Sequence, residues 1–223
     1  MTDSRYREAP TPQGREFGRS FRAEFGDLLA WRRDVRHFRT DPLPDALVEQ
    51  LLDLACLAPS VGNAQPWRFV SVDKSENRAA VVANFTAANA QALEGYGGER
   101  AALYAKLKLS GLREAPRHFA VFCDEMTEQG GGLGRKTMPE TLRYSAVLAV
   151  HSLWLAARAH GVGIGWVSIL DPEALRKALD VPKDWSLVAY LCLGYPVEES
   201  IEPELQRVGW QARDTVCRQV LKR

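Results

Sequence analysis

Residues 186–196, SLVAYLCLGYP, are apolar at every position from Leu187 to Leu193. A strand with one wet face alternates apolar and polar residues, whereas a continuous apolar run is typical of a strand that is covered on both faces. We therefore expect residues 186–196 to form a central strand of a sheet that helices cover. Every other element has to be placed around this strand.

The rest of the chain mixes helical and strand patterns. Apolar spacing predicts helices at 24–35, 45–58, 76–112 and 140–160. Pro44 is expected as the first residue of the second helix, EGYGGE as a break in the third, and Gly161 as the cap that ends the fourth. Short apolar runs predict strands at 68–72, 118–124 and 164–170, and Asp171 with Pro172 opens a further short helix. This order predicts one α+β domain over residues 21–223, preceded by a flexible arm over residues 1–20.

The bulk composition is that of an ordinary globular protein. Of the 223 residues 46% are hydrophobic, and 29 Lys and Arg stand against 28 Asp and Glu, for a net charge of +1. That balance argues against nucleic acid or a membrane as a partner. The four cysteines lie far apart, three of them in apolar runs, which is typical of buried thiols in a reducing compartment. With no apolar leader or membrane-spanning run, we expect a cytoplasmic protein.

Several familiar motifs fail on inspection. The glycines of GVGIGW, 161–166, follow a predicted helix and precede a strand, the reverse of the order in a dinucleotide-binding fingerprint. The stretch GGGLGRKT has Arg135 where a phosphate-binding P-loop requires glycine. The four histidines show no ligand spacing, so no metal site is expected.

Three stretches remain as candidates for binding. RRDVRHF, 32–38, gathers arginines that suit phosphate oxygens, or it is simply a solvated helix end where Asp34 pairs with an arginine. APSVGNAQPW, 58–67, offers polar side chains and exposed amides, or it is a tight loop between a helix and a strand. In GVGIGWVSIL, 161–170, glycines bring the backbone close to something flat, or they serve packing alone.

In this order and spacing, the three stretches resemble the flavin-binding nitroreductase superfamily from about residue 20 onward. That resemblance implies a mainly antiparallel sheet flanked by helices, in a domain-swapped homodimer with flavin sites at the subunit interface. It also implies that the arginine stretch binds the FMN phosphate, while the other two stretches lie against the flavin. The flavin-contacting residues it implies are Arg32, Arg33, Asp34, Val35, Arg36, Ser60, Leu109 and Ser168.

Within the superfamily the chain is most similar to the 5,6-dimethylbenzimidazole synthases. The resemblance rests on Asp34, where nitroreductases usually have serine, and on the stretches 104–116, 122–124, 132–145 and 163–170. It implies that reduced FMN is the substrate and that O2 fragments it to 5,6-dimethylbenzimidazole, the lower ligand of vitamin B12, and erythrose 4-phosphate. Asp34 would handle protons near the ribityl carbon, since a carboxylate is a far better base than serine, and Ser168 would donate to an oxygenated flavin.

Further expectations and alternatives follow from the same resemblance. Arg207 is either a second phosphate contact or a surface arginine, and residues 94–116 form a candidate lid. A separate flavin reductase would supply the reduced FMN. The alternatives are an NAD(P)H-dependent FMN nitroreductase or flavin reductase that keeps its flavin, and a non-enzymatic flavin-binding protein in which Asp34 is dispensable.

Overall fold

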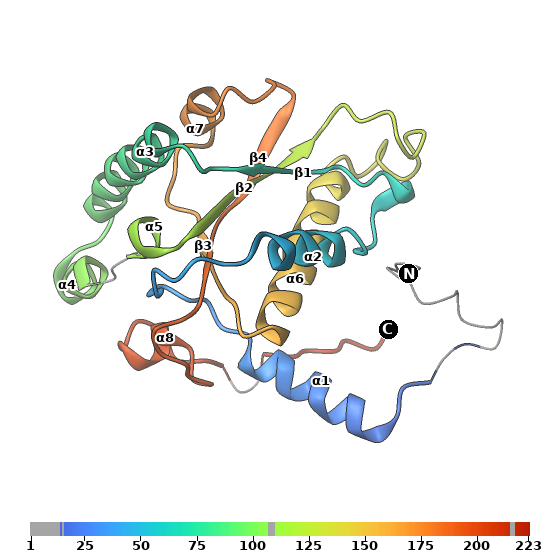
Figure 1. Ribbon diagram of the computed structural model, residues 1–223, viewed down its shortest axis with the longest axis horizontal. Coiled ribbons are helices and arrows are strands. Elements are labelled where there is room, and N and C mark those ends of the chain that lie inside the picture. Colours follow the sequence, from blue (N-terminus) through green and yellow to red (C-terminus); the bar gives the residue numbers. More distant parts are fainter. Residues whose placement is uncertain (1–13, 15, 107–109, 215–216) are drawn as a thin grey trace.

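The computed structural model describes residue 14 and residues 16–106, 110–214 and 217–223. Its centre is an antiparallel sheet, as the family resemblance implied, and the strands lie in the order β1-β2-β4-β3. The strands are β1 (Trp67–Ser71), β2 (Arg117–Asp124), β3 (Gly163–Val167) and β4 (Trp185–Gly194). The predicted central position of 186–196 is confirmed, because β4 lies between β2 and β3 (Figure 1).

Helices cover both faces of the sheet (Figure 1). One face packs against α2 (Asp45–Ala55) and α6 (Thr141–Ala159), and the other against α3 (Ser75–Glu94), α5 (Gly111–Glu114) and α7 (Pro172–Ala178). Alternate residues of β4 serve the two cores: Ala189 and Leu191 face α2 and α6, while Tyr190 and Cys192 face the other layer. This double burial is the physical reason for the unbroken apolar run.

The remaining helices lie at the edges of this sandwich. They are α1 (Arg19–Trp31), α4 (Gly98–Lys106) and α8 (Glu204–Arg207), with a single 3-10 turn at Val61–Asn63. The predicted break in 76–112 is confirmed by the separation of α3 from α4. In the part of the chain described, no helix has the length and apolarity needed to cross a membrane.

Two capping predictions hold and one is shifted. The Asp171 side chain accepts hydrogen bonds from the amides of Glu173 and Ala174, and Gly161, with φ of 73°, follows the end of α6. Pro44 was expected inside α2 but is its N-cap residue, one position earlier.

Three other expectations were wrong. The helix predicted for 24–35 ends at Trp31, because the next residues leave it to bridge to β3. The strand predicted for 164–170 ends at Val167. All four thiols are free, and Cys123 and Cys192 are buried as expected, but Cys56 is exposed because it follows the last residue of α2. Most of the predicted arm, residues 1–13 and 15, lies outside the described residues, so the domain division stays a prediction.

Candidate flavin site

The segment that follows α1 is held in an extended conformation against β3. Arg32 caps α1 with extended backbone, the Val35 amide donates to the Ile164 carbonyl at 3.0 Å, and the Trp154 indole donates to the Arg33 carbonyl at 3.3 Å. The RRDVR stretch is therefore not a loose helix end but a strip of chain fixed by two elements far away in the sequence.

Two glycines of β3 make this approach possible. A Cβ atom on Gly163 would lie 2.7 Å from the Val35 side chain, and one on Gly165 would overlap the Val35 carbonyl oxygen. Gly163 and Gly165 thus bring β3 close to the chain's own Val35 segment. The packing alternative accounts for them, and the expected contact with a flat ligand is not needed to explain them.

Asp34 is fixed at both carboxylate oxygens. Its Oδ1 accepts a hydrogen bond from the Trp166 amide at 2.9 Å, and its Oδ2 accepts one from the Arg36 guanidinium at 3.3 Å. Burial raises the pKa of the carboxyl group, while the Trp166 amide and the charge of Arg36 act in the opposite direction. The side chain is still 36% exposed, so it is desolvated by its neighbours yet remains open to a ligand.

A cavity of about 330 Å³ lies beside this segment, and we call it the arginine cavity. Its volume is in the range of small-molecule sites. Its charged lining residues are Arg32, Arg33, Asp34, Arg36, Glu204 and Arg213. Four guanidinium groups therefore face two carboxylates, which is a donor set suited to an anion.

Arg33 shows most clearly that the arginine cavity carries excess positive charge. Its guanidinium donates to two carbonyls, of Ile201 at 2.6 Å and Arg32 at 2.7 Å, neither of which supplies a negative charge. Burial, together with the like charges of Arg32 and Arg213, lowers the pKa of Arg33. A bound phosphate would offset this repulsion, so the residues present fit the phosphate end of a flavin nucleotide.

Arg213 was missed by the sequence reasoning. Nothing local distinguishes it from other arginines of the C-terminal stretch, and only the fold brings it to Arg33. Arg207 lines a neighbouring cavity of about 310 Å³, together with Arg33, Asp34 and Arg36, and it also pairs with Glu198 at 2.7 Å. Arg207 thus lies near the candidate site, but with its charge already partly balanced.

The other predicted site residues lie elsewhere. Ser168 is exposed one residue past β3, about 7 Å along the chain from Trp166 at the usual rise of a strand. Ser60 begins the turn after α2, where its Oγ accepts from the Gln65 amide at 3.1 Å. Neither of these described serines lines the two cavities above, and Leu109 lies outside the described residues.

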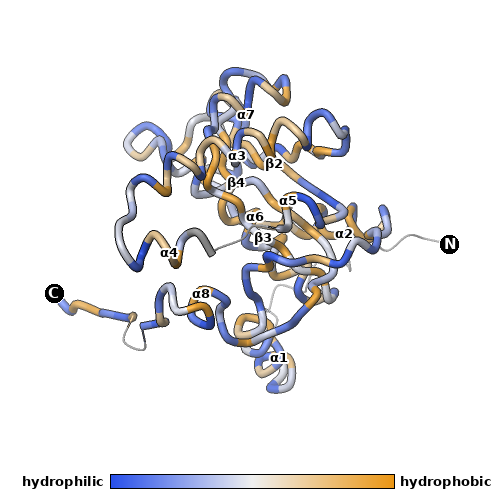
Figure 2. The backbone as a smooth tube through the Cα atoms, turned by 90° about the vertical axis from the view of Figure 1, so that its left-hand side faces the viewer, coloured by the Kyte–Doolittle hydropathy of each residue, from blue (hydrophilic) through white to orange (hydrophobic). Residues whose placement is uncertain are grey.

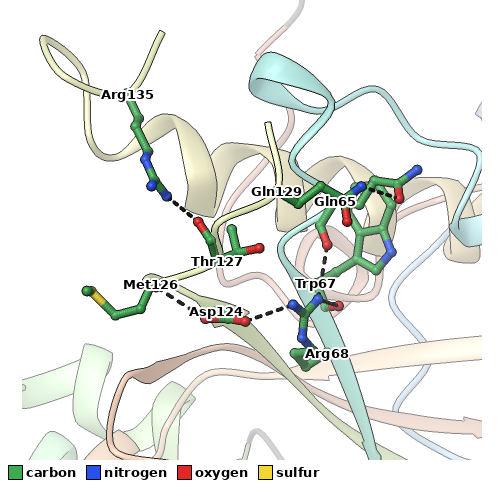
Figure 3. A network of polar contacts seen from close by, with 8 residues as sticks. All are labelled: Gln65, Trp67, Arg68, Asp124, Met126, Thr127, Gln129 and Arg135. Carbon is green, nitrogen blue, oxygen red and sulfur yellow. Dashed lines mark hydrogen bonds and ion pairs between the residues drawn. The ribbon is translucent and has the colours of Figure 1, made fainter. Parts of the chain in front are cut away.

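The Ser60 turn is a rigid structure in its own right (Figure 3). Asn63 and Gln65 both have positive φ, of 57° and 44°, which is strained for residues other than glycine. Gln129 donates to the Asn63 carbonyl and the Gln65 side chain, and Arg68 ties the Gln65 carbonyl to Asp124. Such strain, held by polar contacts from the 124–135 loop, is typical of a turn shaped for a ligand.

Comparison with known proteins identifies the family and the fold. A family model described as "Nitroreductase family" matches residues 29–195, which include the Asp34 segment, the strained turn and the whole sheet. The chain belongs to the nitroreductase family. In the residues described, no group of three His, Cys, Asp or Glu side chains is arranged to hold a metal ion.

Among its relatives in the nitroreductase family, three have the same name. A 5,6-dimethylbenzimidazole synthase of Rhodospirillum rubrum is 59% identical over 197 residues, covering 88% of this chain and 93% of that protein. One from Rhodobacter capsulatus is 49% identical over 195 residues, with 87% and 94% covered. A solved iodotyrosine deiodinase, bound to FMN and 3-iodo-L-tyrosine, superposes with a TM-score of 0.69 at 25% identity, over 89% of this chain and 97% of that one.

Proposed function

We propose that this protein is a 5,6-dimethylbenzimidazole synthase, which uses O2 to fragment reduced FMN to 5,6-dimethylbenzimidazole and erythrose 4-phosphate. The support is the 46–59% identity to three proteins of that name, covering nearly nine-tenths of the chain. The single structural observation that carries the proposal is a carboxylate at position 34, fixed by Trp166 and Arg36 at the rim of an arginine-lined cavity. No observation favours a hydride-shuttling nitroreductase or a flavin carrier.

The phosphate group of the substrate would bind to the arginine side chains. Arg32, Arg33 and Arg213 would bind the phosphate oxygens, while Arg36 stays paired with Asp34. Binding of the phosphate there would bring the ribityl chain within reach of Asp34 and so would hold the reactants in a defined geometry. Reduced flavin supplies the electrons for O2; the protein supplies orientation and proton handling.

Asp34 would then move a proton at the ribityl chain. Its raised pKa makes the carboxylate a stronger base than an exposed aspartate, and the Trp166 amide keeps one oxygen oriented while the other can accept a proton. The charge of Arg36 acts against that rise and supports the ionised form of the carboxyl group. We assign Ser168 and Ser60 to the flavin ring side, as the family resemblance implies.

The working form would be a homodimer. Phe21, Phe25 and Leu29 form a stripe along α1 with four-residue spacing, and each is more than 40% exposed. An apolar stripe of this length on a helix calls for a partner surface. A second copy would cover it, as the family resemblance implies, and a separate flavin reductase in the cytoplasm would supply reduced FMN. The four free thiols are in keeping with that compartment.

A single-turnover experiment tests the proposed function. FMN is reduced without oxygen, mixed with excess protein and exposed to O2, and the products are separated by chromatography. We expect 5,6-dimethylbenzimidazole to appear as flavin disappears. Quantitative return of intact FMN with hydrogen peroxide would show that the flavin is only reoxidised by O2, and it would overturn the proposal.

A further inference from the structure

Trp210, in the chain that follows α8, contacts α4. Figures 1 and 2 show α8 near α4. From α4, the Arg100 guanidinium donates to the Trp210 carbonyl at 3.0 Å and lies over the indole, 4.2 Å from its centroid. Tyr96 packs edge-on against the same ring at 5.5 Å, and Tyr104 lies 6.2 Å from it. One indole thus joins three residues of the α4 region to the C-terminal segment.

The two tyrosines are themselves anchored. Their rings stack on each other at 4.8 Å, and the Tyr104 hydroxyl donates to the Asn89 side chain of α3 at 2.8 Å. Tyr104 is almost fully buried, and burial raises the pKa of its hydroxyl, which therefore stays a neutral hydrogen-bond donor. Trp210 therefore packs against two tyrosines, Tyr96 and Tyr104, that are held by each other and by α3.

Trp210 is rigidly connected to Arg213. Gly209, with φ of 77°, ends α8 and turns the chain so that the Trp210 amide donates to the Leu205 carbonyl at 2.8 Å. The Arg213 amide then donates to the Gln206 side chain at 3.0 Å. Trp210 and Arg213 are therefore two ends of one short turn, with the indole on α4 and the guanidinium in the arginine cavity.

We propose that Trp210 is a positioning residue that couples α4 to the arginine cavity. Contact with α4 holds the turn so that Arg213 faces Arg32 and Arg33, and a phosphate bound by these arginines holds α4 in return. The proposal rests on the proposed function in one respect, that the phosphate belongs to a flavin nucleotide. Because coupling between two sites is reciprocal, each contact strengthens the other by the same factor.

The energetic reason lies in the repulsion among the arginines. Arg32 and Arg213 act on Arg33 as like charges, and moving Arg213 away from Arg33 would relieve part of this repulsion. The Trp210 contacts oppose that movement without changing the net charge of the arginine cavity. A tryptophan that served packing alone would stabilise the fold equally for every ligand, whereas a positioning residue acts on phosphate-bearing ligands only.

Binding of FMN and riboflavin separates these two roles, because the two molecules differ by the phosphate. We expect Trp210→Ala to raise the Kd for FMN about tenfold, within the usual range of coupling between sites, and to leave the Kd for riboflavin within about twofold. Trp210→Phe, which keeps an aromatic ring, should bind FMN nearly as the natural chain does. Equal losses for both flavins would overturn the proposal.

A double-mutant cycle with Arg213 tests the route of the coupling. Arg213→Ala should itself weaken FMN but not riboflavin, and adding Trp210→Ala should then have no further effect beyond about twofold. Arg100→Ala, which removes a Trp210 contact on the α4 side, should reproduce the phosphate-selective loss to a smaller degree. Losses that add in full would show that Trp210 acts independently of Arg213.

Hydrogen exchange gives the reverse direction of the coupling without any turnover. FMN, and inorganic phosphate at higher concentration, should slow exchange of the Gly98–Lys106 amides in the natural chain but not in Trp210→Ala. Riboflavin should do so in neither. Since these measurements use oxidised flavin, the coupling can hold while the single-turnover experiment yields no 5,6-dimethylbenzimidazole, and the two proposals fail separately.

Discussion

Burial disfavours the charged form of both His118 and Asp34, yet the two side chains differ in how their surroundings support that form and give access to it. His118 is 1% exposed, bonds to the Tyr190 hydroxyl at 2.8 Å, and its Nε2 has no hydrogen-bond partner among the described residues. Burial lowers the pKa of His118 to about 4, so the ring stays neutral. Asp34 has a backbone amide and a guanidinium to support its charge, and it stays partly open.

The difference separates a structural group from one suited to chemistry. A buried ring that never changes charge near neutral pH can only pack and orient its neighbours. A desolvated carboxylate whose charge is supported and which lines a cavity can exchange a proton with a ligand. Burial by itself is therefore a poor guide to function. A buried titratable group is suited to chemistry when its neighbours stabilise the charged form and a ligand can reach it.

Replacing Asp34 should have the largest effect. We expect Asp34→Asn to lower the single-turnover rate by about 10²- to 10⁴-fold, the usual contribution of a general base or acid, while FMN still binds. Asparagine keeps an oxygen for the Trp166 amide, so the local structure should survive. Unchanged turnover would remove Asp34 from the chemistry.

The same substitution should not destabilise the fold at neutral pH. Because the folded state raises the pKa of Asp34, it binds the proton more tightly than the unfolded state does, and stability due to this group falls as pH rises through the folded pKa. Asp34→Asn should therefore have an equal or higher Tm at pH 7, and the difference should shrink toward pH 4. A lower Tm at pH 7 would show that the carboxylate is held for structure.

His118 should show the opposite pH dependence. Its folded pKa of about 4 lies below the ordinary value of 6.5, so the unfolded state binds more protons in that interval. The free energy of unfolding should fall by up to about 3 kcal/mol as pH drops from 6.5 to 4. In the double variant His118→Phe/Tyr190→Phe both polar partners are removed, and urea unfolding at pH 7 and 4.5 should lose this slope. A slope of the same size in the double variant would assign it to other groups.

Gly165→Ala should lower the stability of the fold where the Asp34 segment packs against β3, with a smaller effect than the substitutions above. The added Cβ overlaps the Val35 carbonyl, and overpacking of this kind costs about 1–3 kcal/mol. Gly26→Ala is the matched control, since nothing lies within 4 Å of that Cβ inside α1 and a helical alanine stabilises by about 0.5–1 kcal/mol. Thermal unfolding of both variants measures the contrast, and equal Tm values would show that the close approach of Val35 to β3 is unimportant.

The sheet could be predicted from sequence because its pattern repeats residue by residue. Each position of β4 reports on its own face, so a run from Leu187 to Leu193 carries several independent signs of burial. The ends of elements that stop because of a contact distant in sequence were predicted less accurately. The apolar spacing of α1 does not show that the helix stops at Trp31, because the helix ends through a bridge between Asp34 and Ile164, which lie far apart in the sequence.

The candidate site was predictable only where its residues are neighbours in sequence. Arg32, Arg33, Asp34 and Arg36 stand in one short stretch, and the structure places them around shared cavities. Arg213 joins them from the far end of the chain, and the glycines of β3 owe their identity to Val35. Both relations depend on folding, and the flavin roles of Ser60, Leu109 and Ser168 stay predictions.

The strip from Arg33 to Arg36 has a consequence for solubility. β3 is an outer strand of the sheet, and exposed outer strands are templates for pairing with foreign chains and for aggregation. The strip lies along this edge, occupies the Ile164 carbonyl and the Trp166 amide, and places charged side chains there. The residues assigned to the flavin site thus also shield the sheet, which restricts how freely this segment can change.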